Sequence, residues 1–425
     1  MRIKNIAVSA QKASIRLAAA EAGLKDRALH QIADSLENKK DRIVAANEVD
    51  LERSAKEKLA LPLLKRLKFD AAKIDDVIEG IHSLIELPDP VGQTLAATEM
   101  DRGLELYKVS CPIGVVGVIF ESRPDALVQI STLALKSGNS VLLKGGSEAR
   151  ETNKILAEII SAATEEAGIP SGWLQLLETR TDVNEMLKLD DFIDLIIPRG
   201  SNDFVRYIMD NSRIPVLGHA DGICHCYVHR DAGLEMAVKV AVDSKIQYVA
   251  ACNAAETLLV DREIAGTFLP LISEAFKQKQ VEILGCETTR KIIGAAPASD
   301  GDWGTEYLDY KISVKVVQNL DVAIEHINTY GSGHTDTIIT KDQEAAKKFM
   351  SLVDSGNVFW NCSTRFSDGF RYGLGAEVGI STNKIHARGP VGLEGLLIYK
   401  YKLAGSGQIV EDYANRIKKF THRTI

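Results

Sequence analysis

The sequence lacks any long apolar run. Nowhere does it approach the ~20 consecutive apolar residues that a membrane-spanning helix needs. Its N-terminus, MRIKNIAVSAQKAS, also lacks the apolar segment of a secretion signal. Basic residues are not in excess, since the 425 residues carry a net charge of -7, whereas a nucleic-acid-binding surface clusters Lys and Arg. These absences predict a cytoplasmic protein that binds neither membranes nor nucleic acid.

Cysteine is scarce as well. Six cysteines without a secretion signal predict free thiols rather than a disulfide framework. Four side chains of metal-binding type occur in 223-ICHCYVH-229, but strand alternation puts Cys224 and Cys226 on one face and His225 on the other. No second pair of ligands supports a zinc site. The segment therefore predicts a buried strand, and the sequence predicts no metal site.

The arrangement of apolar residues predicts an α/β protein. A chain of this length is expected to form two or three domains. Residues 1 to 87 have apolar positions three and four apart, which predicts helices that end at 88-PDP-90. Short apolar runs then alternate with helical stretches, which predicts parallel strands; these runs are 114-GVVGVIF-120, 140-SVLLK-144, 172-GWLQLL-177, 192-FIDLIIP-198 and 222-GICHCYV-228.

One cysteine has the surroundings of a nucleophile. Cys252 lies among small residues in 245-KIQYVAACNAAETLLV-260, which leaves room for a substrate carbonyl. We expect a helix to begin here, because backbone N–H groups and the positive end of a helix dipole stabilise a thiolate. The alternative is a buried structural cysteine, which is the commoner fate of an isolated Cys.

Two predicted strands end in residues that suit an anionic nucleotide. Lys144 ends the first and is followed by Gly145 and Gly146, which offer a cation and flexible backbone donors. Arg199 follows the second, ahead of a predicted helix over residues 203–210. Neither turn has a GxGxxG or Walker sequence, so a simple turn is the alternative for each. Ligands of parallel sheets bind beyond the carboxyl ends of the strands, where both turns lie.

Nine segments, spread in order over nearly the whole chain, resemble the gamma-glutamyl phosphate reductase family, a branch of the aldehyde dehydrogenase superfamily. Two strings, 331-GSGHTD-336 and 386-HARGPVGLEGL-396, are specific to this branch. The other segments are 111-CPIGVVGVIFESRPDA-126, 140-SVLLKGGSEA-149, 195-LIIPRGSN-202, 215-PVLGHADGICH-225, 252-CNAAETLLV-260, 303-WGTEYLDY-310 and 355-SGNVFWNCSTRFSDG-369.

The resemblance implies a fold and a division into domains. The expected fold is α/β and aldehyde dehydrogenase-like, with a Rossmann-type parallel sheet in the NADP-binding domain, residues 1–97 and 113–221. Residues 222–385 would form an α/β catalytic domain. Residues 98–112 and 386–425 would form an oligomerisation element and a C-terminal tail. A homo-oligomer and a contact with glutamate 5-kinase are further expectations, while the number of subunits is left open.

The resemblance also implies a reaction, the NADPH-dependent reduction of L-glutamyl 5-phosphate to L-glutamate 5-semialdehyde and phosphate, the second step of proline biosynthesis. Cys252 would form a thioester. Its backbone N–H and a donor from 120-FESRPD-125 would stabilise the charged acyl oxygen; Ser122 stands there where many relatives have asparagine. The branch usually has Arg-Pro-Gly-Val where this chain has 248-YVAA-251. A CoA-acylating aldehyde dehydrogenase and a non-catalytic nucleotide-binding scaffold are the alternative functions.

Three residues are expected to contact the substrate. Arg123 would bind the phosphoryl group bidentately, with a pair to Glu121 or Asp125 as the alternative. Arg365 would hold the α-carboxylate, with a surface salt bridge as the alternative. His219 stands where hydrolytic relatives have the glutamate that activates water. We predict that it is no efficient base for water, being either turned away or engaged with substrate.

Five residues are expected to bind the cofactor. The resemblance places Lys144 on the adenine ribose and Glu306 on the nicotinamide ribose, a solvated loop carboxylate being the alternative for Glu306. The resemblance also aligns Gly200 and Ser201 with a cofactor-binding turn, which follows the predicted strand over residues 192–198. Ser147 occupies a position where NAD-preferring relatives often have a carboxylate that would repel a 2′-phosphate. The expected cofactor is therefore NADP.

Overall fold

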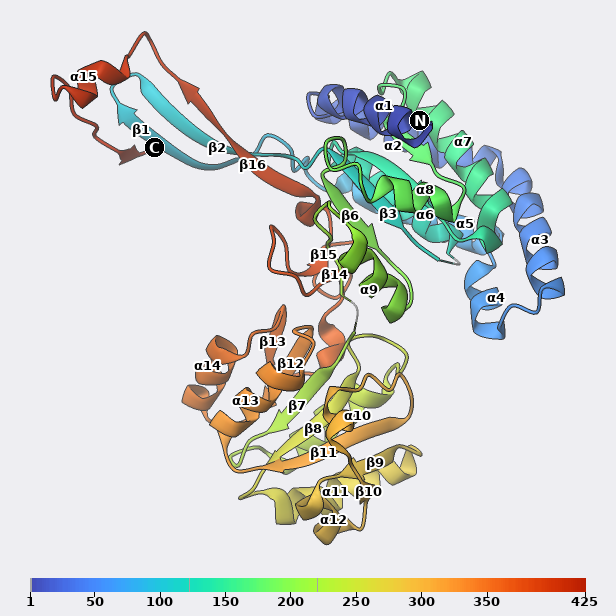
Figure 1. Ribbon diagram of the computed structural model, residues 1–425, viewed down its shortest axis with the longest axis vertical. Coiled ribbons are helices and arrows are strands. Elements are labelled where there is room, and N and C mark those ends of the chain that lie inside the picture. Colours follow the sequence, from blue (N-terminus) through green and yellow to red (C-terminus); the bar gives the residue numbers. More distant parts are fainter. Residues whose placement is uncertain (1, 122, 220) are drawn as a thin grey trace.

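The N-terminal part of the chain is helical. The computed structural model describes residues 2–121, 123–219 and 221–425, and Figure 1 shows their arrangement. The predicted helices are confirmed, and α5 begins after Asp70, whose carboxylate accepts a hydrogen bond from the backbone N–H of Lys73. The predicted end of the helical region at 88-PDP-90 is confirmed as well, since α5 ends at Glu86. The five helices are α1 (Arg2–Leu17), α2 (Ala22–Asn38), α3 (Lys40–Lys56), α4 (Leu61–Leu67) and α5 (Ala71–Glu86).

The first parallel sheet has four strands in the order β5-β4-β3-β6, and four predicted runs supply them. Its strands are β3 (Val115–Ile119), β4 (Ser140–Lys144), β5 (Leu174–Leu176) and β6 (Leu195–Pro198). The helices between and after them are α6 (Pro124–Lys136), η1 (Ser147–Ala149), α7 (Arg150–Ala167), α8 (Arg180–Met186) and α9 (Asn202–Asn211). Apolar residues of β3 and β4 pack in one core with α2, α5, α6 and α7.

The second parallel sheet has seven strands in the order β10-β9-β11-β8-β7-β12-β13. The buried strand predicted around residues 222–228 is its β7. The strands are β7 (Cys224–Val228), β8 (Ala255–Asp261), β9 (Glu282–Gly285), β10 (Ala296–Pro297), β11 (Lys311–Val317), β12 (Thr335–Ile339) and β13 (Asn357–Trp360). The helices are α10 (Leu234–Ile246), α11 (Ala265–Gln278), α12 (Glu287–Ile293), η2 (Asp300–Gly304), α13 (Leu320–Tyr330), α14 (Gln343–Leu352) and η3 (Thr364–Phe366).

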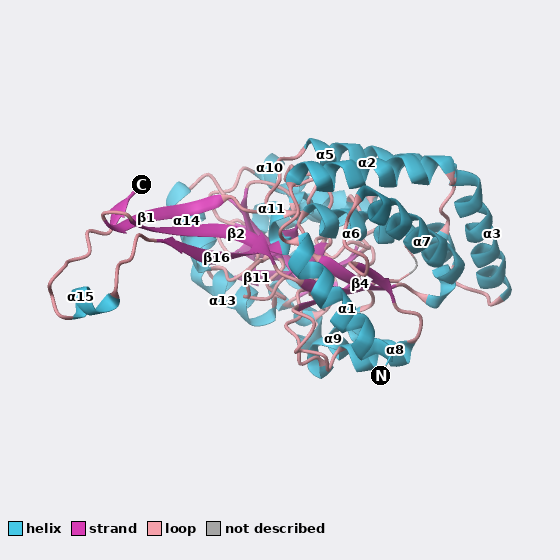
Figure 2. Ribbon diagram, turned by 90° about the horizontal axis from the view of Figure 1, so that it is seen from above, coloured by secondary structure: helices cyan, strands magenta, loops and turns pink. Residues whose placement is uncertain are grey.

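An antiparallel arm projects from the body, on the side away from α3 in both Figure 1 and Figure 2. Its strand order is β16-β2-β1-β17. The arm contains β1 (Thr94–Asp101), β2 (Leu104–Pro112), β16 (Leu397–Ala404), α15 (Val410–Ala414) and β17 (Arg423–Thr424). It therefore joins two segments that are almost 300 residues apart, because residues 397–404 pair with residues 105–112.

The predicted domain limits can be placed on these elements. The limit at residues 97 and 98 falls inside β1. The limit at residues 385 and 386 falls between β14 (Gly379–Ser381) and β15 (Gly389–Val391), which pair with each other ahead of η4 (Glu394–Leu396). The division itself stays a prediction. Within the described residues, no helix has the length and apolarity to cross a membrane.

Candidate active site

Cys252 lies at the amino edge of the seven-stranded sheet, in the turn between α10 and β8. The expected helix after Cys252 is wrong, because residues 255–261 form a central strand paired with β7 and β11. Small apolar residues followed by Leu and Val suit either a helix or a buried strand, and the neighbouring strands decided the outcome. A helix dipole starting at this turn therefore does not stabilise the thiolate.

The turn around Cys252 is held from two sides. The backbone of Gly222, just before β7, packs so tightly that a Cβ there would lie 2.0 Å from the carbonyl oxygen of Cys252. The same carbonyl accepts a hydrogen bond from the thiol of Cys224 at 3.3 Å. Burial raises the pKa of Cys224 well above its usual value, so this thiol keeps its proton. Asn253 donates to the carbonyl of Ser367 at 2.8 Å, which fixes the residue after the cysteine.

Two histidines face the cysteine. The ligand-type atoms of His219, Cys252 and His334 lie within 4.8 Å of one another. The two rings meet edge to face, with centroids 4.8 Å apart. His219 is therefore not turned away from the cysteine, which removes one of the two predicted explanations for it. Its Nδ1 lies 2.8 Å from the carbonyl oxygen of Ile380, to which it donates, so Nε2 carries the lone pair.

Electrostatics keep the His219 imidazole neutral. Its pKa is lowered, mainly by burial and further by the nearby charge of Arg199. His334 is fully buried and directly precedes β12. Sequence reasoning gave His334 no role, although it lies within the family-specific string 331-GSGHTD-336. A histidine just before a strand does not reveal in the sequence that a cysteine 82 positions earlier faces it.

Arginines lie near the cysteine. Arg199 is partly buried, and its pKa is lowered by burial and by the charge of Arg123, while Cys252 is also within electrostatic range. Arg123 pairs with Asp125 at 2.7 Å, as the alternative interpretation predicted. Sequence reasoning noted Arg199 only as part of a strand end, because its proximity to the cysteine depends on how the two sheets pack.

Arg365 is 8% exposed, so it is not a surface residue. Its Nε donates to Oε1 of Gln247 at 2.9 Å. No carboxylate of the described chain lies within ion-pair distance of it, so the alternative interpretation, a surface salt bridge, is not seen in that part. Burial lowers its pKa, and the charge of Cys252 opposes this shift. Ser122, the predicted second oxyanion donor, lies outside the described residues.

Four of the five predicted cofactor residues lie at the carboxyl edge of the four-stranded sheet, and Glu306 is the exception. Lys144 ends β4 and is buried, and its Nζ donates to the carbonyl of Gly145. Burial lowers the pKa of Lys144, while the charge of Glu148 opposes the shift. Ser147 is exposed at the start of η1. Arg53 of α3 donates to the carbonyls of Ser147 and Glu148 at 2.9 and 3.0 Å, a contact that the sequence could not reveal.

Glu306 joins the two sheets. Its Oε2 accepts a hydrogen bond of 2.6 Å from Asn202, the first residue of α9. A backbone hydrogen bond from Gly222 favours its ionised form, but burial is the larger effect and raises its pKa. Glu306 is thus a partly buried carboxylate, and the solvated-loop interpretation is wrong. Gly200 and Ser201 form the exposed turn before α9.

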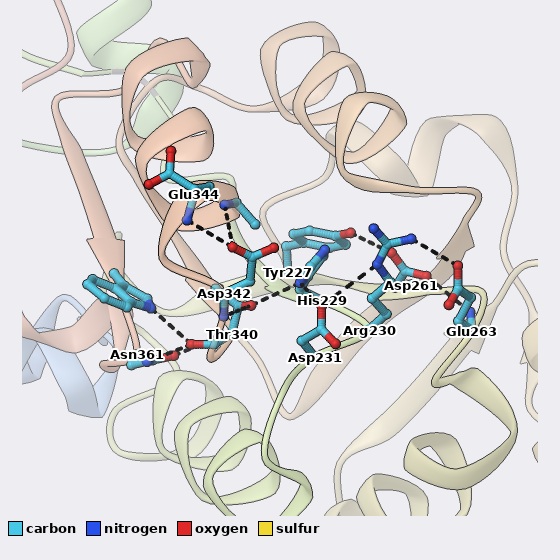
Figure 3. A network of polar contacts seen from close by, with 12 residues as sticks. Tyr227, His229, Arg230, Asp231, Asp261, Glu263, Thr340, Asp342, Glu344 and Asn361 are labelled. Carbon is cyan, nitrogen blue, oxygen red and sulfur yellow. Dashed lines mark hydrogen bonds and ion pairs between the residues drawn. The ribbon is translucent and has the colours of Figure 1, made fainter.

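The opposite edge of the seven-stranded sheet is occupied by its own polar network, shown in Figure 3. The hydroxyl of Tyr227 donates to Asp261 at 2.9 Å, and Nδ1 of His229 lies 2.9 Å from the hydroxyl of Thr340. The general rule places ligands at carboxyl ends of strands. The predicted cofactor residues Lys144 and Ser147 lie at that edge of the four-stranded sheet, whereas Cys252 lies at the amino edge of the seven-stranded sheet.

Two parallel sheets with a cysteine between them define the class of the protein. The chain belongs to the aldehyde dehydrogenase family, whose sequence model matches residues 1–290. The expected aldehyde dehydrogenase-like α/β fold is therefore confirmed.

Comparison with individual proteins narrows the class. The chain is 72% identical to the gamma-glutamyl phosphate reductase of Acetivibrio thermocellus, over 99% of this chain and 98% of that protein. It is 70% identical to the same enzyme of Pelotomaculum thermopropionicum, over 100% and 98%. The crystal structure of gamma-glutamyl phosphate reductase from Thermotoga maritima superposes with a TM-score of 0.93 at 41% identity, covering 96% of this chain and 99% of that one. Within the aldehyde dehydrogenases, the chain is thus a member of the gamma-glutamyl phosphate reductase family.

Proposed function

We propose that the chain reduces L-glutamyl 5-phosphate to L-glutamate 5-semialdehyde with NADPH, as a step of proline biosynthesis. The observation that carries the proposal is the position of Cys252. It lies within electrostatic range of Arg199, which follows β6 at the carboxyl edge of the four-stranded sheet, and of Arg365 in η3. The Cys252 sulfur attacks the acyl carbon, the bond from that carbon to the phosphate oxygen breaks, and a thioester remains. Reduction of the thioester would need a hydride, which NADPH supplies when bound; the carbon–sulfur bond then breaks, which releases the aldehyde and frees the Cys252 thiolate.

The charges around the cysteine fit this substrate. An acyl phosphate of glutamate carries a phosphate and an α-carboxylate, both of which arginine binds well. Arg199 and Arg123 lie close enough for one charge to lower the pKa of the other group. Two cations in such proximity are stabilised by an anion between them. We assign the phosphoryl group to Arg123 and Arg199, and the α-carboxylate to Arg365.

Negative charge on the acyl oxygen has donors available. The backbone N–H of Cys252 has no hydrogen-bond partner among the described residues, and it would point at the oxygen of an acyl group on its own side chain. Ser122 is proposed as the second donor. His219 engages the substrate rather than water, with its ring fixed through Nδ1 by the carbonyl of Ile380.

The carboxyl edge of the four-stranded sheet fits a dinucleotide. Lys144 provides a cation there, and α9 begins at the exposed Gly200–Ser201 turn with no side-chain cap on its N–H groups. Lys144 and Glu306 would contact the two riboses. The missing carboxylate at Ser147, with the guanidinium of Arg53 beside its backbone, supports NADP over NAD. Glu148 opposes this preference, since its carboxylate lies over Gly146.

The arm is proposed to join copies of the chain. Strand β16 is an edge strand whose side chains are largely exposed, including Tyr399, Tyr401 and Leu403 at 51, 60 and 58%. Exposed apolar side chains along an unpaired edge favour association with another strand. All six cysteines are free thiols. Contact with glutamate 5-kinase stays a prediction, which co-sedimentation of the two purified enzymes would test.

The reaction is tested in reverse. Purified enzyme with glutamate semialdehyde is expected to reduce NADP only when phosphate is present. Faster turnover with CoA than with phosphate would favour a CoA-acylating enzyme, and no turnover with either would contradict the proposal. Light scattering of the unmutated protein and of Tyr401→Glu tests the role of the arm. The substituted protein is expected to form an assembly of lower mass.

A further inference from the structure

We propose that His219, Cys252 and His334 form a binding site for Zn²⁺, and that zinc bound there reversibly inhibits the enzyme. Among the described residues, the ligand-type atoms of these three side chains make one compact group, within 4.8 Å of one another. One thiolate and two imidazoles form a donor set that binds zinc more strongly than it binds magnesium or calcium. This zinc is an inhibitor and takes no part in the reaction.

The two histidines are oriented as metal ligands usually are. In a ligating histidine, one ring nitrogen binds the metal and the other N–H donates to a fixed acceptor. Nδ1 of His219 donates to the carbonyl of Ile380 at 2.8 Å. Nδ1 of His334 lies 2.8 Å from the hydroxyl of Thr335, which can accept its proton. Both rings can therefore offer Nε2 to a metal.

A second, independent observation points to a ligand at this place. His334 is fully buried, and its Nε2 has no hydrogen-bond partner within the part of the chain that the structure describes. A buried polar atom without a partner costs about 1–3 kcal/mol. A metal ion between the two histidines would supply the missing partner.

The geometry requires a small adjustment. Zinc bonds of about 2.0 Å to nitrogen and 2.3 Å to sulfur place tetrahedral ligands roughly 3.3–3.6 Å apart. The three side chains must thus close by about 1 Å, and Cys252 lies in a turn rather than in a strand. Arg199 and Arg365 oppose a cation here, whereas Glu306 and Glu377, which are within range of His219, favour one.

Occupation of the site removes the nucleophile. Zinc binding displaces the thiol proton of Cys252 and forms a sulfur–zinc bond, so the sulfur can attack neither an acyl phosphate nor an alkylating agent. Three protein ligands leave the fourth zinc position to water. Loss of alkylation by iodoacetamide can be measured without any substrate, and this readout is independent of the proposed reaction.

The test is zinc binding by isothermal titration calorimetry to full-length, chelator-treated enzyme. We expect one zinc per chain, loss of iodoacetamide labelling at Cys252, and recovery of labelling with EDTA. Cys252→Ala and His334→Gln should each weaken binding by at least about tenfold. The matched thiol control Cys362→Ala should bind like wild type, and Mg²⁺ should neither bind nor protect.

Further measurements guard against misfolding and mislocated binding. If His334→Gln fails to give the wild-type circular dichroism spectrum, His219→Gln replaces it, because that side chain is only partly buried. Co²⁺ should give a thiolate-to-metal charge-transfer band that Cys252→Ala lacks. The proposal is overturned if zinc does not bind, if both folded variants bind it like wild type, or if labelling of Cys252 continues with zinc bound.

Discussion

Gly222 and Cys252 touch backbone to backbone. A Cβ on Gly222 would lie 2.0 Å from the carbonyl oxygen of Cys252 and 2.6 Å from its Cα, closer than any real side chain approaches. Gly222 also donates its N–H to Glu306. One glycine thus positions both the proposed nucleophile and a proposed cofactor residue, because only a residue without a side chain lets the two backbones meet.

Gly222→Ala should therefore move Cys252. A shift of about 1 Å in a reacting group can lower the rate by about 100-fold, so we expect kcat to fall by that order while the fold persists. The control is Gly266→Ala in α11, where an added Cβ meets nothing within 4 Å. Steady-state kinetics and circular dichroism of both variants check this. Wild-type kcat in a folded Gly222→Ala would show that the backbone contact does not position the cysteine.

Cys252→Ala should abolish turnover in both directions while leaving NADPH affinity nearly unchanged, because the thioester cannot form. Fluorescence titration checks the NADPH affinity, and rate measurements in each direction check the loss of turnover. Residual activity above about a hundredth of wild type would count against the assignment. Cys362→Ala, which alters another partly exposed free thiol, should keep full activity.

Ser147→Glu should weaken NADPH selectively, by on the order of 1–3 kcal/mol, through repulsion of the 2′-phosphate. The added carboxylate would join that of Glu148 in the same turn. Dissociation constants for NADPH and NADH, measured side by side, provide the check. Ser406→Glu, an identical change on the exposed arm, should alter neither. Equal weakening of both cofactors by Ser147→Glu would refute the role of this position.

The reverse reaction should depend strictly on phosphate or arsenate. His219 stands where hydrolytic relatives have a glutamate, and its Nδ1 is tied to the carbonyl of Ile380. Hydrolysis of the thioester would waste the acyl phosphate, so water must not be activated. His219→Glu should raise phosphate-independent oxidation of the semialdehyde. Appreciable NADP reduction by the unmutated enzyme without phosphate or arsenate would contradict this prediction.

Stability should fall on acidification through His326. Burial, with help from His225 and Lys315, lowers the pKa of His326 to about 3. An unfolded chain titrates near the usual 6.5 and thus binds more protons between these values. Stability is therefore lost as the pH falls from about 6.5 towards 3, by at most about 1.4 kcal/mol per pH unit.

His326→Gln should reduce this dependence, as seen by comparing urea unfolding at pH 5 and pH 7 with wild type. His82→Gln, at an exposed position, is the control and should leave the difference in unfolding free energy unchanged. An unchanged difference in His326→Gln as well would assign the acid sensitivity to other groups.

The sequence alone determined the elements and the family. Apolar spacing predicted helices over the first 87 residues and five strands between residues 114 and 228, because periods of 3.6 and 2 are local properties of the chain. The turn of Cys252, Lys144 and Glu306 could be recognised from strings that resemble known relatives. The residues after Cys252 were wrongly expected to form a helix, since a short apolar run does not distinguish a buried strand from a helix.

Only the tertiary structure decided which residues meet at the cysteine. Arg199 precedes Cys252 in the sequence and His334 follows it, yet both lie near it in the fold. Arg53 of α3 contacts the turn that contains Ser147. Their proximity depends on how the two sheets pack, with the carboxyl edge of one facing the amino edge of the other. Packing between distant segments leaves no periodic signal in a single sequence, so side chains that act together at the site read in the sequence as unrelated residues.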